Sequence, residues 1–382
     1  MSDNKKINIL FISSVCPPSK NVTSTDIMIN NIVEGISMCG HNIILAAVCK
    51  TGDDEAAIKE YYSKFVKEII ILPSNFKKKM TPIEYTISLF KNSYFHSFYR
   101  KNSKILLNVE SDIVISNNVY FDEICYGKEL KKLNPKQEYY QLWTDPMALS
   151  GVTPEIFKKR IKRWPFYIVE KKALKDEERI IYSTKSLMLF QKKMYPKIAK
   201  NMYYVDAGYI PNSESTTNFE VNNKIIYAGN FYKNIRNIEP LVEAIGELGE
   251  YELDIYGSGN CDVIIPENVK FHRRVSLDEL KTKENEFFYS VCILNHSCIQ
   301  IPGKVFYNIQ KNNAVIVVAD GPYREVLIEY LNEYKRFIVC ENNKESIKRA
   351  IISLKDFSFD KEYIETMYSP QKIATDIVNG GL

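Results

Sequence analysis

Cationic side chains beside predicted helix starts are the groups in this sequence best suited to chemistry. Lys304 follows Pro302 and Gly303 where a helix is expected to begin, and unpaired amides there favour an anion such as a diphosphate. Lys233 and Arg236 lie in a loop that follows a predicted strand, and an arginine can hold a diphosphate with two parallel hydrogen bonds. These residues predict a diphosphate site. For Lys233 and Arg236, two solvated surface cations are the alternative.

Two further candidates stand at predicted strand ends. The segment YGSGN has Gly257 and Gly259, which let a backbone approach a ligand closely, although a lone G-x-G is a weak signal. Asp145 follows the predicted strand 139–143 and would act as a base or orient an acceptor hydroxyl. An aspartate before a proline also starts turns and caps helices, which is the alternative for Asp145. His296 would contact donor or acceptor, or be a hydrogen-bonded edge histidine.

Several common motifs are absent from the sequence. There is no G-x-x-x-x-G-K-[ST] loop, no G-x-S-x-G, no Asp-x-Asp pair and no His or Cys cluster with metal-ligand spacing. We therefore expect neither a metal nor a cofactor. The eight cysteines show no C-x-x-C pair, which favours free thiols in a reducing cytosol. Neither a signal peptide nor a transmembrane helix is predicted, so we expect a cytoplasmic protein.

The elements that must position these residues alternate between strand and helix. In the first half, apolar runs at 7–13 and 43–48 flank an amphipathic stretch at 26–38, which is a β-α-β pattern. Later strands are predicted at 68–72, 112–116, 139–143 and 179–183. The loop SSVCPPSKNVTST after the first strand is rich in hydroxyl groups and suits a sugar or polar acceptor, with a solvated loop as the alternative.

A second α/β series begins at Lys224, after a linker-like stretch at 207–223 that is rich in Gly, Pro, Ser, Thr and Asn. Its run AVIVVAD is typical of a parallel strand buried on both faces. The sequence therefore predicts an α/β protein with two Rossmann-like domains facing each other across a cleft. The predicted domains are an acceptor-side domain at 1–206 and a nucleotide-sugar domain at 207–360, and a C-terminal helix at 361–382 would pack back on the first.

Two basic segments, 77–104 and 158–175, interleave cations with aromatic residues. The first holds eight cationic-type side chains counting His96, one Glu and six aromatics. Such segments favour peripheral contact with an anionic bilayer or a lipid-pyrophosphate acceptor, and solvated helix faces are the alternative. The net charge of the 382 residues is only +4, and no nucleic-acid-reading motif is present, so we do not expect a nucleic-acid partner.

Taken together, these motifs resemble the GT-B fold glycosyltransferases, in particular the large retaining group that builds bacterial polysaccharides. The resemblance spans nearly the whole chain. It rests on FISSVCPPS, GHNI and IIYSTKS in the first half, and on IIYAGNFYKNIRNIEPLVEAI, LDIYGSG, VKFHRRVSLDEL and IPGKVFYNIQKNNAVIVVADGPYREV in the second. The last is similar to the family's P-S-K-x-x-E-Y-L run and its trailing strand.

The resemblance implies roles for individual residues. Arg236 would bind the donor diphosphate, Arg273 would border the base, and Glu325 would lie near the donor sugar. The residues assigned to the donor are Asn230, Lys233, Arg236, Gly257, Gly259, Arg273, Gly303, Lys304, Tyr307 and Glu325. Asp145 falls where the first domain presents acceptor-side or catalytic groups.

The sequence departs from the family at its pair of glutamates, whose places are taken by Ile299 and Tyr307. The glycine pair of the first loop is also replaced, around residues 20–22. The leading hypothesis is a metal-independent, retaining transferase at the inner face of the plasma membrane. It would move a sugar from a nucleotide-diphosphate donor, uridine-linked, to a hydroxyl of a glycan or lipid-linked glycan. The alternatives are a catalytically inactive scaffold subunit and a sugar-nucleotide epimerase.

Overall fold

The computed structural model describes residues 6–17, 24–50, 53–76, 81–94, 96–148, 160–175, 179–206, 208, 222–309, 311–354 and 357–382. The chain forms two compact units. The first comprises Met1–Gly208 with Tyr368–Leu382, and the second comprises Tyr209–Met367. The linker predicted at 207–223 and the replaced glycine pair around 20–22 lie wholly or almost wholly outside the described residues.

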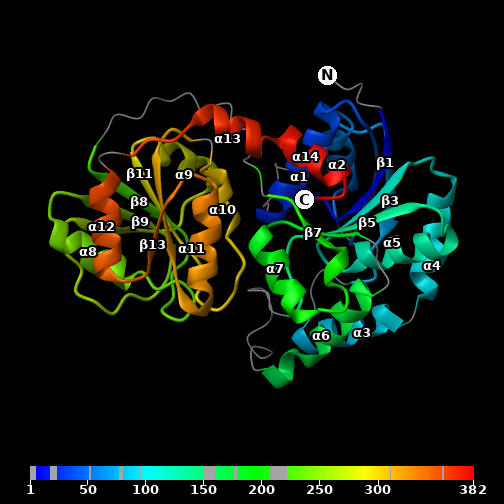
Figure 1. The fold of residues 1–382 in the computed structure, drawn as a ribbon, viewed down its shortest axis with the longest axis horizontal. Helices are drawn as coiled ribbons and strands as arrows, with labels where there is room; N and C mark the ends of the chain where they lie inside the picture. Colours follow the sequence, from blue (N-terminus) through cyan, green and yellow to red (C-terminus); the bar gives the residue numbers. More distant parts are fainter. Residues whose placement is uncertain are drawn as a thin grey trace. The chain divides into compact units, whose positions relative to one another are not determined.

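A seven-stranded parallel sheet forms the centre of the first unit, in the order β3-β2-β1-β4-β5-β6-β7 (Figure 1). Its central strands are continuous apolar runs, such as NIILAAVC in β2, because helices flank both faces of such a sheet. The strand order reverses beside β1, which pairs with β2 on one side and β4 on the other. The strands are β1 (Asn8–Ser13), β2 (Asn42–Cys49), β3 (Glu68–Pro73), β4 (Ile113–Asn118), β5 (Glu138–Trp143), β6 (Arg179–Tyr182) and β7 (Met202–Tyr204).

The helices of the first unit include one from the far end of the chain. Figure 1 shows the C-terminal helix α14 beside α1. A Cβ added at Gly35 in α1 would overlap the carbonyl oxygen of Pro370, so glycine permits this close approach. The helices are α1 (Ser24–Met38), α2 (Glu55–Tyr62), α3 (Pro82–Tyr94), α4 (Ser97–Ser103), η1 (Lys104–Asn108), α5 (Asp122–Leu133), α6 (Arg160–Leu174), α7 (Lys185–Met194), η3 (Ala199–Asn201) and α14 (Pro370–Val378).

A six-stranded parallel sheet forms the centre of the second unit, in the order β10-β9-β8-β11-β12-β13. The apolar run AVIVVA forms β12 and is buried along its whole length, as the sequence predicts. The strand order reverses beside β8, which pairs with β9 and β11. The strands are β8 (Lys224–Ala228), β9 (Glu252–Tyr256), β10 (Val269–His272), β11 (Tyr289–Ile293), β12 (Ala314–Ala319) and β13 (Ile338–Glu341).

Helices cover both faces of this second sheet. Figure 1 shows α8 and α12 on one side and α10 and α11 on the other. Apolar side chains of α8 and α12 form one core with β8, β9, β11 and β12. The helices are α8 (Glu239–Leu248), α9 (Leu277–Glu284), α10 (Gly303–Tyr307), η4 (Gly321–Tyr323), α11 (Arg324–Glu333), α12 (Lys344–Ser353) and α13 (Lys361–Tyr368), the last of which ends at the boundary between the units.

These observations confirm the predicted α/β class and the two Rossmann-like domains. The prediction omitted β7, β10 and β13, whose three or four residues are too short for a periodic signal. The helix predicted after Pro302 is a single short turn, with Pro302 as its N-cap residue.

Candidate functional site

The carboxyl ends of β8 and β11 mark the point where the strand order of the second sheet reverses. From β8 the chain runs outward to β9 and β10, and from β11 it runs outward to β12 and β13. The loops after β8 and β11 therefore leave in opposite directions. In open parallel sheets ligands bind at such a point, outside the carboxyl ends of the strands.

Lys304 brings an ammonium group to this point. It is the second residue of α10, which follows the loop after β11, yet its Nζ reaches the end of β8. Nζ donates to the carbonyl oxygen of Ala228 at 2.7 Å and lies 4.5 Å from the ring centroid of Tyr227. A Cβ added at Gly229 would lie only 3.0 Å from Nζ, so the absence of a side chain there leaves room for the ammonium group.

Among the described residues, no carboxylate forms an ion pair with the ammonium of Lys304. Burial lowers its pKa. The positive charge of Arg236 adds to this effect, and Cys292 and Glu284 oppose it without reversing it. Among the described residues, no carboxylate oxygen lies within 4.0 Å of Nζ. A cation withdrawn from water, whose contacts in the described part of the chain are a neutral carbonyl and an aromatic ring, would be stabilised by a bound anion.

Arg236 supplies a second cation from the loop after β8. Its Nε donates to Oδ1 of Asn295 at 2.8 Å, and Asn295 follows β11. Nδ2 of Asn295 in turn donates to the Cys298 sulfur at 3.6 Å, which holds the amide in place. Within the described part of the chain, the two terminal nitrogens of Arg236 have no hydrogen-bond partner. A half-buried guanidinium whose terminal nitrogens are available is suited to donate hydrogen bonds to two phosphate oxygens.

A polar network ties together the loops at the carboxyl ends of four strands. The His296 amide donates to the Ile235 carbonyl at 2.8 Å, and His296 Nδ1 lies 3.1 Å from Oδ1 of Asp320. Nδ2 of Asn342 donates to Oδ2 of Asp320 at 2.9 Å and to the carbonyl of Asn237 at 3.0 Å. The loops after β8, β11, β12 and β13 are thereby held in register around the two cations.

Gly257 and Gly259 follow β9, next to the loop after β8. A Cβ at Gly257 would overlap the carbonyl oxygen of Gly229, and one at Gly259 would overlap that of Phe231. The two loops therefore approach each other so closely that only glycine fits. Contact of these glycines with a nucleotide stays a prediction.

Lys233 and Asn230 lie in the same loop as Arg236, but they have other surroundings. Lys233 is 60% exposed and lies 3.3 Å from Glu239 and 4.0 Å from Asp262, so two carboxylates neutralise it locally. Asn230 is exposed, and its carbonyl accepts from the Tyr227 hydroxyl at 3.2 Å.

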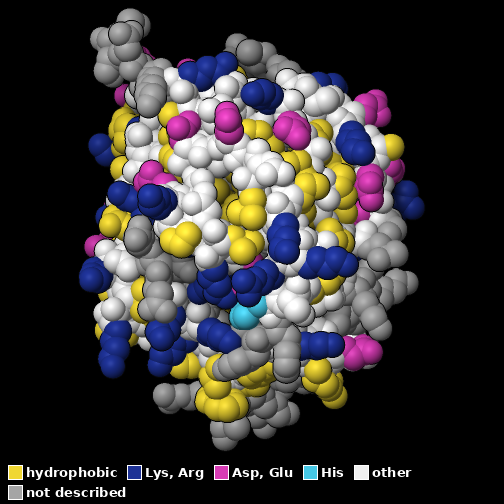
Figure 2. All heavy atoms as spheres, turned by 90° about the vertical axis from the view of Figure 1, so that its right-hand side faces the viewer, with side chains coloured by type: hydrophobic (Ala, Val, Ile, Leu, Met, Phe, Trp, Pro, Cys, Tyr) yellow, Lys and Arg dark blue, Asp and Glu magenta, His cyan; other side chains and the backbone are white. Residues whose placement is uncertain are grey.

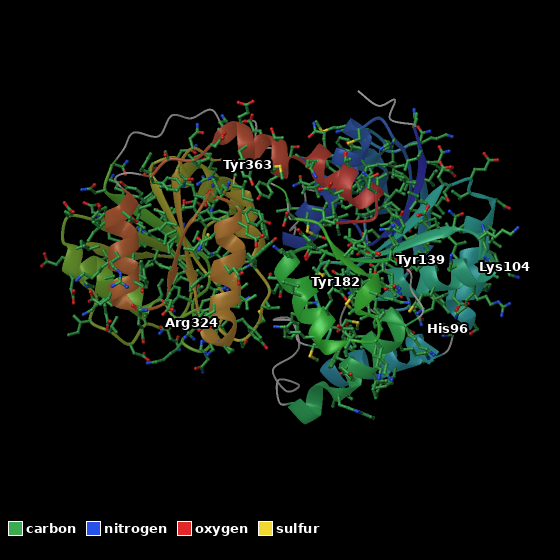
Figure 3. The ribbon with its side chains drawn as sticks, viewed as in Figure 1. His96, Lys104, Tyr139, Tyr182, Arg324 and Tyr363 are labelled. Carbon is green, nitrogen blue, oxygen red and sulfur yellow. The ribbon has the colours of Figure 1, made fainter. Side chains whose placement is uncertain are left out.

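The remaining predicted donor residues are dispersed. Arg273 is exposed after β10, the far edge strand, about 10 Å from β8 at the usual strand spacing. Glu325 is 84% exposed and lies 3.7 Å from Arg324, at the start of α11 (Figure 3). Gly303 begins α10, and the side chain of Tyr307 lies outside the described residues. Because α10 has only five residues, its dipole is small and the Lys304 side chain is the larger source of positive charge.

In the first unit, Asp145 is half-buried after β5, as predicted. The described residues that follow it, 146–148, do not begin a helix, so no helix cap is seen there. The preceding residue is held on both sides: Oγ1 of Thr144 donates to the Asn118 carbonyl at 3.3 Å, and its own carbonyl accepts from Ser183 Oγ at 3.1 Å.

A buried acidic group that was not among the predicted site residues lies near the reversal point of the first sheet. Glu123 accepts the amides of Ser14, after β1, and Tyr120, after β4, each at 3.1 Å. Burial, followed by the charge of Asp122, raises the pKa of Glu123 to about 7. The signal available was the pair Asp122-Glu123 directly after a predicted strand and its polar loop. Asn295 and Asp320, each just beyond a strand end, share that signal.

Two properties of the described residues bear on the other predictions. No group of three or more His, Cys, Asp or Glu side chains among them is arranged to hold a metal ion. Nor does any helix in the described ranges combine the length and apolar character needed to cross a bilayer.

Comparison with solved structures identifies the fold as GT-B. The chain is similar to sucrose-phosphate synthase from Thermosynechococcus elongatus, with a TM-score of 0.64 and 14% identity over 98% of both chains. It is also similar to the N-terminal domain of trehalose-6-phosphate phosphatase from Candida albicans, with a TM-score of 0.59 and 11% identity over 97% of this chain and 96% of that one. A trehalose-6-phosphate protein from E. coli, bound with UDP-2-fluoro glucose, gives 0.54 and 8% over 97% and 95%. No protein-family model and no curated protein sequence matches the chain.

Proposed function

We propose that this protein transfers a sugar from a nucleoside-diphosphate donor, uridine-linked, to a hydroxyl group of a glycan or lipid-linked glycan. The observation that carries the proposal is the pair of cations at the β8–β11 reversal point. Lys304 has no carboxylate within 4.0 Å among the described residues, and the fork of Arg236 has no hydrogen-bond partner among them. A diphosphate would satisfy both.

In this proposal the two cations have one chemical role. As the bond between sugar and diphosphate breaks, negative charge grows on the departing nucleotide. Arg236 would donate two parallel hydrogen bonds to it, and Lys304 would add a point charge in a place partly withdrawn from water. Because hydrogen bonds to Asn295 and to the Ala228 carbonyl already hold Arg236 and Lys304 in place, little reorganisation is needed when the charge develops.

Other parts of the proposal rest on similarity. The E. coli neighbour was solved with UDP-2-fluoro glucose, which supports a uridine-linked donor here. Retention of configuration and independence from metal follow from the family resemblance alone. Asp145 is the acceptor-side candidate, because it follows a strand of the first sheet at its carboxyl edge.

Arg236→Ala tests the donor assignment. Loss of a two-pronged charged contact of about 2–3 kcal/mol should weaken UDP binding about 30–150-fold in calorimetry. Arg349→Ala is the matched control, because Arg349 is exposed on α12 and away from the strand ends. Unchanged UDP affinity in Arg236→Ala would remove this residue from the donor site.

A panel of nucleotide sugars then separates the possible functions. Release of free nucleoside diphosphate, lost in Arg236→Ala, supports a transferase. Tight binding with no release, with or without an acceptor, would support the inactive scaffold instead. An isomerised sugar nucleotide formed without any acceptor would support an epimerase.

A further inference from the structure

Two adjacent carboxyl groups are buried at the start of α5 in the first unit. On the face that Figure 2 shows, Lys and Arg side chains lie at the surface with Asp and Glu among them, as is usual for charged groups. Asp122 and Glu123, in contrast, are fully buried. A carboxyl group withdrawn from water must be satisfied by hydrogen bonds, so its partners show what it holds in place.

Glu123 joins two loops that are far apart in the sequence. Its Oε1 accepts the amide of Ser14, in the loop after β1, and its Oε2 accepts the amide of Tyr120, in the loop after β4. The strands β1 and β4 are neighbours where the order of the first sheet reverses. One side chain with both oxygens engaged therefore holds these two loops against each other.

Packing alone does not account for a carboxyl group at this position. Burial raises the pKa of Glu123 to about 7, so the ionised form is costly in the folded state. A side chain of similar volume without charge would fill the same space at a lower cost. What the carboxyl group adds is two acceptor oxygens, one for each loop.

Asp122 serves a different loop. It accepts hydrogen bonds from the Ser74 hydroxyl and, at 3.2 Å, from the amide of Asn75, both in the loop after β3. The hydroxyl of Tyr99, on α4, also donates to it. The two carboxyl groups thus have separate partners, and only Glu123 connects the loops after β1 and β4.

The turn that brings Glu123 to these loops is strained. Phe121 is buried and has a φ of 80°, which is rare for a bulky side chain. Such a conformation persists only where the surrounding structure holds it. Glu123 contributes to this, because it bonds to the amide of Tyr120 on the other side of Phe121.

A polar atom without a partner lies next to the connected loops. Nδ2 of Asn117, near the end of β4, donates to Oγ of Ser13 at 3.3 Å, and that hydroxyl donates to the Ser14 carbonyl at 2.9 Å. These bonds fix which end of the Asn117 amide faces Ser13. Its Oδ1 is buried and has no hydrogen-bond partner in the described part of the chain. Unmet capacity of this kind indicates a bound water or a ligand that donates hydrogen bonds.

The ring of Tyr120 is the exposed part of this arrangement. It is 39% exposed, and Nζ of Lys50, just after β2, lies 3.2 Å from its centroid. Tyrosine combines an apolar ring with a polar hydroxyl, which suits a ligand that has both apolar and hydroxyl-bearing faces, such as a sugar.

We propose that Glu123 is a positioning residue, which holds the loops of Ser14 and Tyr120 so that a hydroxyl-bearing acceptor binds at this edge of the first sheet. Glu123 is buried and acts through the two loops. The Tyr120 ring would contact the acceptor, and Asn117 Oδ1 would accept from one of its hydroxyl groups, directly or through a water. The nature of the ligand rests on the proposed function, whereas the connection between the loops does not.

Hydrogen–deuterium exchange of the full chain, without ligand, tests the connection. Glu123→Gln keeps the size of the side chain but has a single acceptor oxygen, so it can hold only one of the two loops. At pH 8, amide exchange in one of the segments 13–16 and 118–121 should become about 10–100-fold faster. Asp122→Asn is the matched control, since it makes the same chemical change at the same depth, and none of the partners of Asp122 lies in either segment.

Turnover tests the positioning role. With a nucleotide sugar from which the wild type releases nucleoside diphosphate, Glu123→Gln should lower the rate at saturating donor by about tenfold or more. UDP affinity should equal that of the wild type, because Arg236 and Lys304 belong to the second unit.

Three results would overturn the proposal. They are unchanged exchange in both segments for Glu123→Gln, faster exchange spread evenly over the first unit, and turnover at the wild-type rate despite faster exchange. The second result would make Glu123 a packing residue. If the wild type releases no nucleoside diphosphate while exchange changes as expected, the proposed function fails and the connection between the loops stands.

Discussion

Replacing Lys304 by methionine should separate ligand binding from stability in one variant. Methionine keeps most of the length of the side chain and removes its charge. The folded protein then loses the hydrogen bond from the ammonium to the Ala228 carbonyl, at 2.7 Å, and the contact of the ammonium with the Tyr227 ring, at 4.5 Å. No ion pair within 4.0 Å is lost among the described residues. The ligand, in contrast, loses a cation that pairs with no carboxylate among the described residues.

The effects of Lys304→Met on stability and on UDP binding can both be estimated, and they should have opposite signs or differ strongly in size. Loss of one hydrogen bond costs stability about 1 kcal/mol, and removal of a desolvated charge restores about 1–4 kcal/mol, so the free energy of unfolding should stay the same or rise. Loss of a charge-assisted contact to a phosphate costs binding about 2–3 kcal/mol. That corresponds to a UDP affinity about 30–150-fold lower.

Calorimetry with UDP and urea unfolding measure the two quantities on the same preparation. Lys224→Met is the control, because Lys224 is exposed at the opposite end of β8 and should change neither. A Lys304→Met variant that binds UDP like the wild type would refute the assignment of Lys304 to the donor site. A variant that is destabilised by several kcal/mol would refute the view of its charge as uncompensated.

Two further predictions concern buried charges. Burial raises the pKa of Glu123 from 4.5 to about 7. Between these two pH values the unfolded state has released the proton and the folded state still holds it. The free energy of unfolding should therefore fall by about 3 kcal/mol as the pH rises from about 4.5 to about 7. Glu123→Gln should flatten this fall, measured by urea unfolding at pH 4.5 and pH 8 with the fluorescence of buried Trp143, and an unchanged slope would contradict the assignment. Arg336 is buried and donates to four backbone carbonyls between residues 308 and 313. Arg336→Met would leave these carbonyls without their donor, at about 1–3 kcal/mol each, and removal of the desolvated charge would offset part of that loss. The free energy of unfolding should therefore fall by about 3–5 kcal/mol. Arg349 is exposed, so Arg349→Met should change the free energy of unfolding by less than about 0.5 kcal/mol in the same urea assay. Equal changes for Arg336→Met and Arg349→Met would show that the buried contacts of Arg336 contribute little.

Some features of the candidate site were predictable because they are local. A buried parallel strand is an apolar run, and the polar residue that ends it lies at the carboxyl edge of the sheet, where ligands bind. This reasoning placed Asp145 and the loop of Arg236 at strand ends, as the structure has them. It did not find Asn295 or Asp320, whose importance comes from partners on other loops.

Side-chain direction was not predictable. Lys233 and Arg236 are three residues apart in one loop, and composition does not distinguish them. The structure turns Lys233 toward Glu239 and Arg236 toward Asn295, so only Arg236 joins Lys304 at the reversal point. A loop without periodicity takes its conformation from the elements packed around it, and these are contributed by distant segments.

The sequence by itself determined that the protein has two α/β units, because the alternation of apolar runs with amphipathic stretches is a short-range property. It also determined which residue types stand at strand ends. Only the tertiary structure decided which of them meet. The strand order places β8 beside β11, and this brings Lys304 to the carbonyl of Ala228 and within reach of the charge of Arg236. Strand order depends on long-range pairing and on how helices pack over both faces, and periodicity along the chain does not encode it.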